Sequence, residues 1–315
     1  MQRRLLLAAL AAAGLPLAAR ADEWPSRPVR MVIPFPPGGG TDIGGRIWGQ
    51  RMAEVVGQPV VVDNRGGAGG VIGTRLVGQA APDGYTLLFN GTASVVRDNF
   101  DPRTVVDHVV RVIATHNILV VNPSVPARTV PEFIAYAKAN PGKLNHGTSG
   151  PLASQHLAAV MFDLFAGTRM ENVHYRGTGP AVAGILGNEV QVMFGSMSAV
   201  LPLIQDGKVR ALATASARRS KLLPDLPTVG EFVPNYAAEL TYSLCTPLGA
   251  SAALKRRLET TVKTVLETES VVNELRIRGF EPDYEIGDAL ARAIDDDMKL
   301  WADVTRRANI NLNTQ

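Results

Sequence analysis

The chain has 315 residues, 46% of them hydrophobic and only 6% aromatic, which is enough for one large or two ordinary domains with an apolar core. Its 32 basic and 29 acidic residues give a net charge of +3. Three of the basic residues fall within the first 21 residues, which contain no acid, so the remainder is balanced at 29 of each sign. This balance gives no indication of nucleic acid binding. Cys245 is the single cysteine, which excludes an intrachain disulfide.

The first 21 residues have the pattern of a secretory signal peptide. Arg3 and Arg4 precede an apolar run over residues 5–13, and Ala19 and Ala21 supply the small residues of a cleavage site. The apolar run is too short to span a bilayer. We therefore expect residues 1–21 to be removed and the remainder to be exported. A buried N-terminal helix is the alternative interpretation.

Short apolar runs alternate with helical patterns along the rest of the chain. The predicted strands are 29–33, 60–63, 86–89, 119–122, 144–147, 171–175, 190–194, 209–214 and 241–245. The predicted helices are 43–56, 71–80, 153–165 and 180–186, a helix from a capping box at 129–132 to Asn140, and two long ones near 250–279 and 286–308. This alternation predicts an α/β fold with mostly parallel sheets flanked by helices.

Four of the loops after predicted strands share an unusual composition. The segments 35–42, 90–94, 147–154 and 194–199 are rich in Gly, Ser and Thr and contain neither Lys nor Arg. Glycine lets backbone N–H groups approach a ligand, and a helix N-terminus adds unpaired donors with about half a positive charge. Such loops indicate a site for a small anion. Taken singly, each could be a tight turn in which Thr41 or Asp42 caps a helix.

Nucleotide and metal sites are disfavoured by the same residues. Gly38 and Gly40 do not extend to G-x-G-x-x-G because Ile43 takes the last glycine position, and no P-loop motif occurs. The five histidines lack metal-ligand spacing, so we expect neither a metal nor a cofactor. An enzyme is the weaker alternative: Ser149 is not in a G-x-S-x-G elbow, but it could pair with His156 in a periplasmic serine hydrolase.

The order of several motifs resembles a known receptor family. The segments "VIPFPPGGGTD", "VVDNRGGAGGVIGT", "PDGYTLL", "AYAKANPGKL", "HYRGTGPA", "GKVRALATAS" and "LPDLPTVGEF" follow one another over nearly the whole mature chain. In this order they resemble the substrate-binding receptors of tripartite tricarboxylate transporters, the TctC or Bug family of periplasmic proteins.

The resemblance implies a two-lobed periplasmic-binding-protein fold of type II (Venus flytrap). Lobe one would comprise residues 22–120 plus 241–315, and lobe two residues 121–240. A small carboxylate would bind in the cleft, and the closed receptor, acting as a monomer, would deliver it to the membrane permease subunits of a transporter. Ligand contacts carried over by position are Phe35, Gly38, Gly39, Gly40, Thr41, Asp42, Thr92 and Ser94 from lobe one, and Ser149, Gly150, Ser154 and Ser196 from lobe two. Asp42 would accept a hydrogen bond from the ligand or a water.

The sequence departs from the family pattern at several positions near this predicted site. Leu152 and Ala153 stand where the family has a glycine and a hydroxyl residue, and His174 replaces a proline. The usual Trp-Phe-Gly appears as residues 241–243, Thr-Tyr-Ser. We expect these changes to alter specificity. A receptor that presents its ligand to a membrane sensor kinase is the alternative role.

Overall fold

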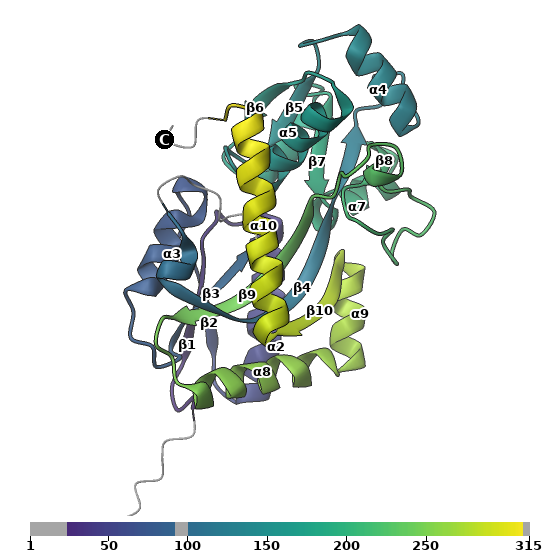
Figure 1. Ribbon diagram of the computed structural model, residues 1–315. Coiled ribbons are helices and arrows are strands. Elements are labelled where there is room, and N and C mark those ends of the chain that lie inside the picture. Colours follow the sequence, from purple (N-terminus) through teal and green to yellow (C-terminus); the bar gives the residue numbers. More distant parts are fainter. Residues whose placement is uncertain (1–23, 92–99, 311–315) are drawn as a thin grey trace, which may run out of the picture.

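The computed structural model describes residues 24–91 and 100–310, and its elements alternate between strand and helix (Figure 1). The predicted signal peptide lies outside the described residues. The strands are β1 (Val29–Ile33), β2 (Val60–Asn64), β3 (Thr86–Gly91), β4 (Val106–Val121), β5 (Asn145–Thr148), β6 (Glu171–His174), β7 (Val192–Ser196), β8 (Arg210–Thr214), β9 (Glu239–Pro247) and β10 (Phe280–Ile286). The α-helices are α2 (Gly40–Val56), α3 (Val71–Gly78), α4 (Val130–Ala139), α5 (Ser154–Ala166), α6 (Thr178–Leu186), α7 (Met197–Gln205), α8 (Ala252–Leu266), α9 (Glu269–Ile277) and α10 (Gly287–Arg307). Short 3-10 turns lie at Ala68–Gly70, Pro102–Thr104 and Val229–Glu231.

The strands form two groups that share the long strand β4. Residues 106–116 of β4 pair with β9 and β10, which belong with β1, β2 and β3; we call this group and its helices the first half. Residues 117–121 of β4 pair with β7 and β8, which with β5 and β6 form the second half. A single strand therefore carries the chain from one half to the other.

The α/β class follows the prediction, but the sheet is mixed. The pairs β1–β2, β1–β3, β5–β6 and β5–β7 are parallel, as the alternating sequence pattern predicts. All pairings of β4, and the pairing of β3 with β9, are antiparallel. The difference arises because β9 runs antiparallel to both of its neighbours, β3 and β4, and so lies outside the strand–helix–strand repeats that give parallel pairs.

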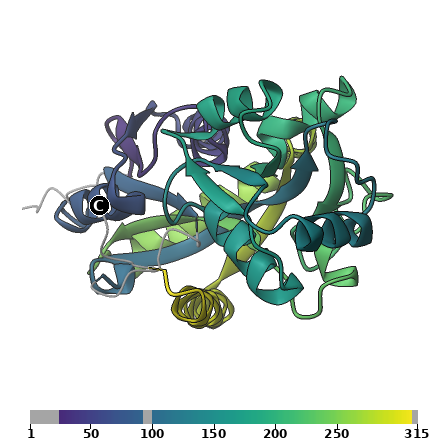
Figure 2. The ribbon, with the colours of Figure 1, turned by 90° about the horizontal axis from the view of Figure 1, so that it is seen from above.

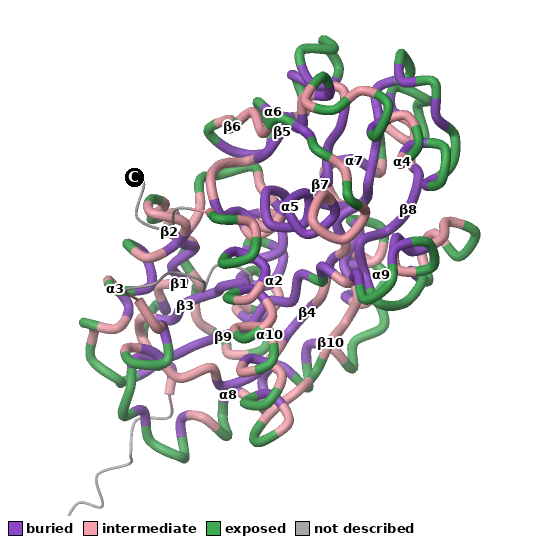
Figure 3. The backbone as a smooth tube through the Cα atoms, turned by 45° about the horizontal axis from the view of Figure 1, so that its top comes forward, coloured by how far each residue is buried: buried purple, intermediate pink, exposed green. Residues whose placement is uncertain are grey.

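Helices cover the sheet on opposite sides. The end-on view in Figure 2 shows the yellow α10 on one side of the strands and the purple α2 on the other. Helix α10 packs against α5 of the second half and against β4 and β10 of the first, so it spans the two halves. Figure 3 shows the buried backbone concentrated along the central strands and α5. Within the described residues, no helix has the length and apolar character needed to cross a bilayer.

The structure differs from the sequence predictions at four places. Strand β4 begins at Val106, well before the predicted 119–122, because its early polar residues are paired rather than solvated: Arg111 forms ion pairs with Asp283 (2.7 Å) and Glu285 (2.6 Å) of β10. The charge-rich β10 was not predicted, and a helix break before Glu269 divides the predicted 250–279 helix in two. Helix α7 was also missed, and it contains Pro202.

Candidate functional site: a pocket ringed by helix N-termini

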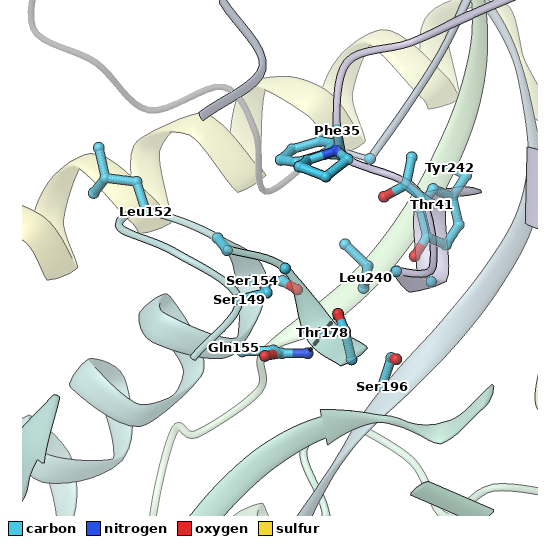
Figure 4. Close-up of a pocket in the computed structure, with 16 residues that line it drawn as sticks. Phe35, Thr41, Ser149, Leu152, Ser154, Gln155, Thr178, Ser196, Leu240 and Tyr242 are labelled. Carbon is cyan, nitrogen blue, oxygen red and sulfur yellow. Dashed lines mark hydrogen bonds between the residues drawn. The ribbon is translucent and has the colours of Figure 1, made fainter. Parts of the chain in front are cut away.

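A pocket lies between the two halves, and both contribute to its lining (Figure 4). The first half supplies Phe35, Pro36, Gly39, Gly40, Thr41, Gly91, Leu240 and Tyr242, and the second half supplies Ser149, Leu152, Ala153, Ser154, Gln155, Gly177, Thr178 and Ser196. The halves come close here, since a β-carbon on Gly39 would lie only 3.4 Å from the Thr178 Oγ1. A ligand in this pocket would contact both halves at once.

Four helices begin at the pocket without a side-chain cap. The residues preceding α2, α5, α6 and α7 are Gly39, Ala153, Gly177 and Ser196, all four of which line the pocket. None of them makes a side-chain hydrogen bond to the first turn of its helix. Of the helices that begin elsewhere, α4 and α8 have side-chain caps, whereas α3, α9 and α10 do not. The first-turn N–H groups at the pocket therefore have no partner within their own helices or from a cap.

These N-termini give the pocket a positive electrostatic character that does not depend on the described side chains. No Asp, Glu, His, Lys or Arg is among the described lining residues. Each helix N-terminus carries roughly half a positive charge together with unpaired N–H donors. Such an arrangement favours an anion held by directed hydrogen bonds, and a carboxylate meets that requirement without a cationic partner.

The rest of the wall is apolar and the space is small. Phe35, Leu152 and Leu240 lie around the pocket, with Leu152 at the upper left of Figure 4 and Phe35 above its centre. The cavity volume is about 60 Å³. At 10–15 Å³ per water position this is room for roughly four to six waters. The pocket suits the head of a small organic acid rather than a bulky ligand.

Asp42 holds the first-half loop and does not line the pocket. Its side chain is 4% exposed. Its Oδ2 accepts from the Gly38 N–H, and its Oδ1 accepts from Arg46 Nε and Asn64 Nδ2, each at 2.9 Å. Asn64 also donates to the Phe35 carbonyl at 3.0 Å. Both carboxylate oxygens thus accept hydrogen bonds from within the protein. We therefore assign Asp42 a role in positioning the loop, in place of the direct ligand contact expected from the sequence.

Replacing Asp42 with alanine is expected to lower stability and to weaken ligand binding indirectly. The change leaves the Gly38 N–H and the Asn64 amide without their acceptor, which costs about 1–3 kcal/mol in unfolding free energy. Urea unfolding measures this loss, and calorimetry measures the affinity. Asp63→Ala is the matched control, because Asp63 is ion-paired to Arg30 away from the pocket. If the control weakens binding as much as Asp42→Ala, the positioning role is wrong.

The same carboxylate makes stability sensitive to strong acid. Burial by itself raises the pKa of Asp42, but the hydrogen bonds from Arg46, Gly38 and Asn64 outweigh it, so the pKa lies below its ordinary value. The stabilisation is therefore present above the unfolded pKa near 4 and is lost as pH falls through the lower folded value.

The second-half loop is held by its own hydrogen bonds. Gly150, which has φ +135° and so favours glycine, donates its N–H to the Thr148 Oγ1 at 3.1 Å. Leu152 has φ +58° and donates its N–H to His156 Nδ1 at 3.0 Å. His156 packs edge-on against His174, with 4.8 Å between ring centroids. These contacts place Leu152 and the start of α5 at the pocket.

The serine–histidine pair of a hydrolase is not assembled. The His156 Nδ1 accepts from the backbone, as above, and no hydrogen bond joins His156 to Ser149 in the described part of the chain. Ser149 lines the pocket, whereas His156 lines a separate surface hollow with Asp163 and Arg169. Among residues 24–91 and 100–310, no group of three or more His, Cys, Asp or Glu side chains could hold a metal ion.

The structure gathers most of the predicted site residues at one pocket. Those that line it are Phe35, Gly39, Gly40, Thr41, Ser149, Ser154 and Ser196. Gly38, Asp42 and Gly150 lie beside it and shape its loops, as described above, while Thr92 and Ser94 lie outside the described residues. The structure adds Gln155, Thr178, Leu240 and Tyr242 to the prediction. Of these, Thr178 had a sequence signal, because residues 177–179, Gly-Thr-Gly, share the glycine and hydroxyl content of the other loops. Tyr242 lies in the 241–243 departure from the family pattern, whereas Leu240 had no sequence signal.

Comparison with known proteins agrees with this architecture. A model of the tripartite tricarboxylate transporter family receptor, TctC, matches residues 45–310. The chain is 33% identical to protein BugT of Bordetella pertussis over 312 residues, covering 96% of each. It is also similar to the solved structures of R. palustris Rpa4515 with adipate (30% identity, TM-score 0.85) and of the periplasmic binding protein BugD (29%, 0.83), each covering 91% of this chain and 99% of the other.

The chain therefore belongs to the TctC family of tripartite tricarboxylate transporter receptors. The Bug proteins are among its relatives, and its fold is the two-lobed α/β fold of these periplasmic binding proteins. The family is one of solute-binding receptors.

Proposed function

We propose that this protein captures a small carboxylate between its two halves and delivers it to a tripartite tricarboxylate-type membrane transporter. The observation that carries the proposal is the convergence of four uncapped helix N-termini on a pocket whose described lining residues include no charged side chain. The similar Rpa4515 structure contains adipate, which is a dicarboxylate. A carboxylate is the anion that both lines of support favour.

In this proposal the two halves act as lobes with the boundaries expected from the sequence, 22–120 plus 241–315 and 121–240. Gly39 and Thr178, one from each half, nearly touch across the pocket, so a bound carboxylate would bring the halves together through contacts to both. The closed form would then dock on the permease subunits. The signal peptide over residues 1–21 would place the receptor, as a monomer, in the periplasm.

A thermal melt of residues 22–315 against a panel of carboxylic acids tests the binding function. The protein is first stripped of carried-over ligand by partial unfolding and refolding. An acid at about a hundredfold its dissociation constant should stabilise the fold by roughly 2.7 kcal/mol, which raises the melting temperature by a few degrees. Uncharged analogues of the same size should give no shift. If no acid of the panel shifts the melt, the proposed ligand class is wrong.

A further inference from the structure

A second hollow lies beside helix α5, apart from the pocket between the halves. Its walls come from α5, from β6 and from Ala308 and Ile310, which follow α10; these elements lie together at the top of Figure 1. Its volume is about 310 Å³, within the range of small-molecule sites and much larger than that of the pocket. We call it the α5 hollow. It can therefore hold a molecule that the pocket is too small to admit.

His156 presents an N–H donor to the α5 hollow. The side chain lines the hollow and is 7% exposed, and burial lowers its pKa to about 4, so at pH 7 the ring is neutral with one proton. Because the Nδ1 accepts from the Leu152 N–H at 3.0 Å, that proton lies on Nε2. The Nε2 has no hydrogen-bond partner among the described residues. A donor buried in this way is costly unless a water or a ligand accepts from it.

Asn172 supplies a second donor, and its direction follows from the same reasoning. Burial lowers the pKa of His146 to about 3, so its ring is neutral, and its Nε2 accepts from the Phe194 N–H at 3.2 Å. Its Nδ1 therefore carries the proton and donates to the Asn172 Oδ1 at 3.1 Å. This leaves the Asn172 amide N–H groups without a partner in the described part of the chain, and Asn172 lines the hollow.

The other groups of the hollow do not require a charged ligand. The Asp163 Oδ1 accepts from the Thr168 Oγ1 at 2.5 Å, and the Oδ2 accepts from the Met170 N–H at 2.8 Å. Arg169 is exposed and lies 3.5 Å from the Glu171 carboxylate. The rest of the wall is apolar and consists of Val160, Leu164, Ala308 and Ile310. The hollow therefore offers two unpaired donors beside an apolar wall.

We propose that the α5 hollow is a second binding site, which takes an uncharged molecule with a carbonyl oxygen on an apolar ring, such as a lactam. The carbonyl oxygen would accept from the His156 Nε2–H and the Asn172 amide, and the ring would contact Val160 and Leu164. An anionic ligand would instead lie beside the Asp163 carboxylate.

An occupant of the hollow would also affect the pocket between the halves, and this part of the inference rests on the proposed function. An acceptor at Nε2 keeps the His156 proton there, so the Nδ1 remains free to accept from Leu152, which lines the pocket. Hydrogen bonds joined in such a chain strengthen one another. Lactam binding should therefore tighten acid binding, and by linkage the acid should tighten lactam binding by the same factor.

NMR titration of ligand-free residues 22–315 with ε-caprolactam tests the second site. The signals of the His156 ring nitrogens and of the Asn172 side-chain amide should shift saturably. Hexamethyleneimine, the same ring without the carbonyl, is a cation at pH 7 and should give no saturable shift at either residue. Ser149 and Thr178 report on the pocket. Absence of a saturable shift at His156 and Asn172 overturns the inference, as do shifts confined to Ser149 and Thr178.

Ala308→Phe places a ring in the hollow and should weaken caprolactam binding at least about tenfold. Ala302→Phe is the matched control, because Ala302 is exposed on α10 and does not line the hollow; it should keep the wild-type dissociation constant. His156→Asn keeps an acceptor for the Leu152 N–H but lacks the Nε2–H donor, so it should weaken caprolactam binding by about three- to tenfold. Wild-type caprolactam binding by Ala308→Phe or His156→Asn, once circular dichroism shows the variant to be folded, contradicts the site.

Calorimetry measures the coupling with an acid that stabilises the wild type. Saturating caprolactam should lower the dissociation constant of that acid about three- to tenfold in the wild type and leave it unchanged in Ala308→Phe. An unchanged constant in the wild type overturns the coupling. If no acid binds, the proposed function is wrong, and the NMR titration still decides whether the hollow is a site.

Discussion

Gly39→Val is expected to abolish ligand binding while leaving the protein folded. Gly39 has φ −87° and ψ 169°, which valine adopts without strain, and its β-carbon would make only an ordinary contact of 3.4 Å with the Thr178 Oγ1. The two methyl groups, however, would enter the small pocket at the start of α2, where the carboxylate is proposed to meet the backbone N–H groups. We expect affinity to fall by at least a hundredfold.

Without ligand, Gly39→Val should lose only about 1 kcal/mol of unfolding free energy, because valine is an unfavourable N-cap residue. Gly187→Val is the matched control: Gly187 has φ −78°, follows α6, and is exposed away from the pocket. Calorimetry with an acid that stabilises the wild type measures both affinities, and circular dichroism verifies the fold. Wild-type affinity in folded Gly39→Val would show that the carboxylate does not bind at this loop.

Stability is expected to fall steeply between about pH 6.5 and pH 4 because three histidines, the buried His146 and His156 and the half-buried His108, are neutral. Burial lowers the pKa of His108 to about 4, that of His146 to about 3 and that of His156 to about 4. In the unfolded chain these groups have a pKa near 6.5. As pH falls below 6.5, the histidines of the unfolded state bind protons that the folded state does not bind. The free energy of unfolding therefore decreases.

The combined effect should reach several kcal/mol by pH 4, since each unit of pKa shift is worth 1.36 kcal/mol. Urea unfolding at a series of pH values measures it, and NMR titration of the histidine ring protons reports each pKa in the wild type. The paired carboxylates act at lower pH: the exposed Glu231, for example, has its pKa lowered to about 2, chiefly by its hydrogen bond from Arg219. Flat stability from pH 7 to 4, with histidines titrating near 6.5, would contradict the prediction.

Protonation of His156 is also expected to affect the pocket. The His156 Nδ1 accepts the Leu152 N–H and so cannot carry a proton in this arrangement. Leu152 and the neighbouring Ala153 line the pocket. Below about pH 4, protonation of His156 would remove the hydrogen bond that holds this loop. Ligand affinity should therefore decrease together with stability at the acid end of the range.

Local sequence signals predicted one part of the site and missed another. The loops that precede α2, α5 and α7 were found because glycine and hydroxyl residues at strand ends have a direct physical use there. Leu240 was missed, and Tyr242 was noted only as a departure from the family pattern and not as a lining residue, because in the sequence both belong to an apolar strand. Only the antiparallel pairing of β9 with β3 and β4 brings their side chains to the pocket.

Long-range pairing also limited how much of the fold could be predicted from the sequence. Strand β1 was predicted with its observed bounds because four of its five residues are apolar and buried. Strand β10 was not, because it carries Asp283, Glu285 and a proline, and it is stabilised by Arg111 of a strand about 170 residues earlier. A pairing between residues so distant leaves no periodic pattern in either segment. The mixed sheet direction was missed for the same reason.

The central claim is that helix N-termini recognise the negative charge of a carboxylate. The most direct test is calorimetric titration of ligand-free residues 22–315 with the tightest-binding acid and with its primary amide, which has the same shape without the charge. We expect the amide to bind at least about tenfold more weakly, corresponding to about 1.4 kcal/mol or more. Equal affinity for the acid and the amide would contradict it.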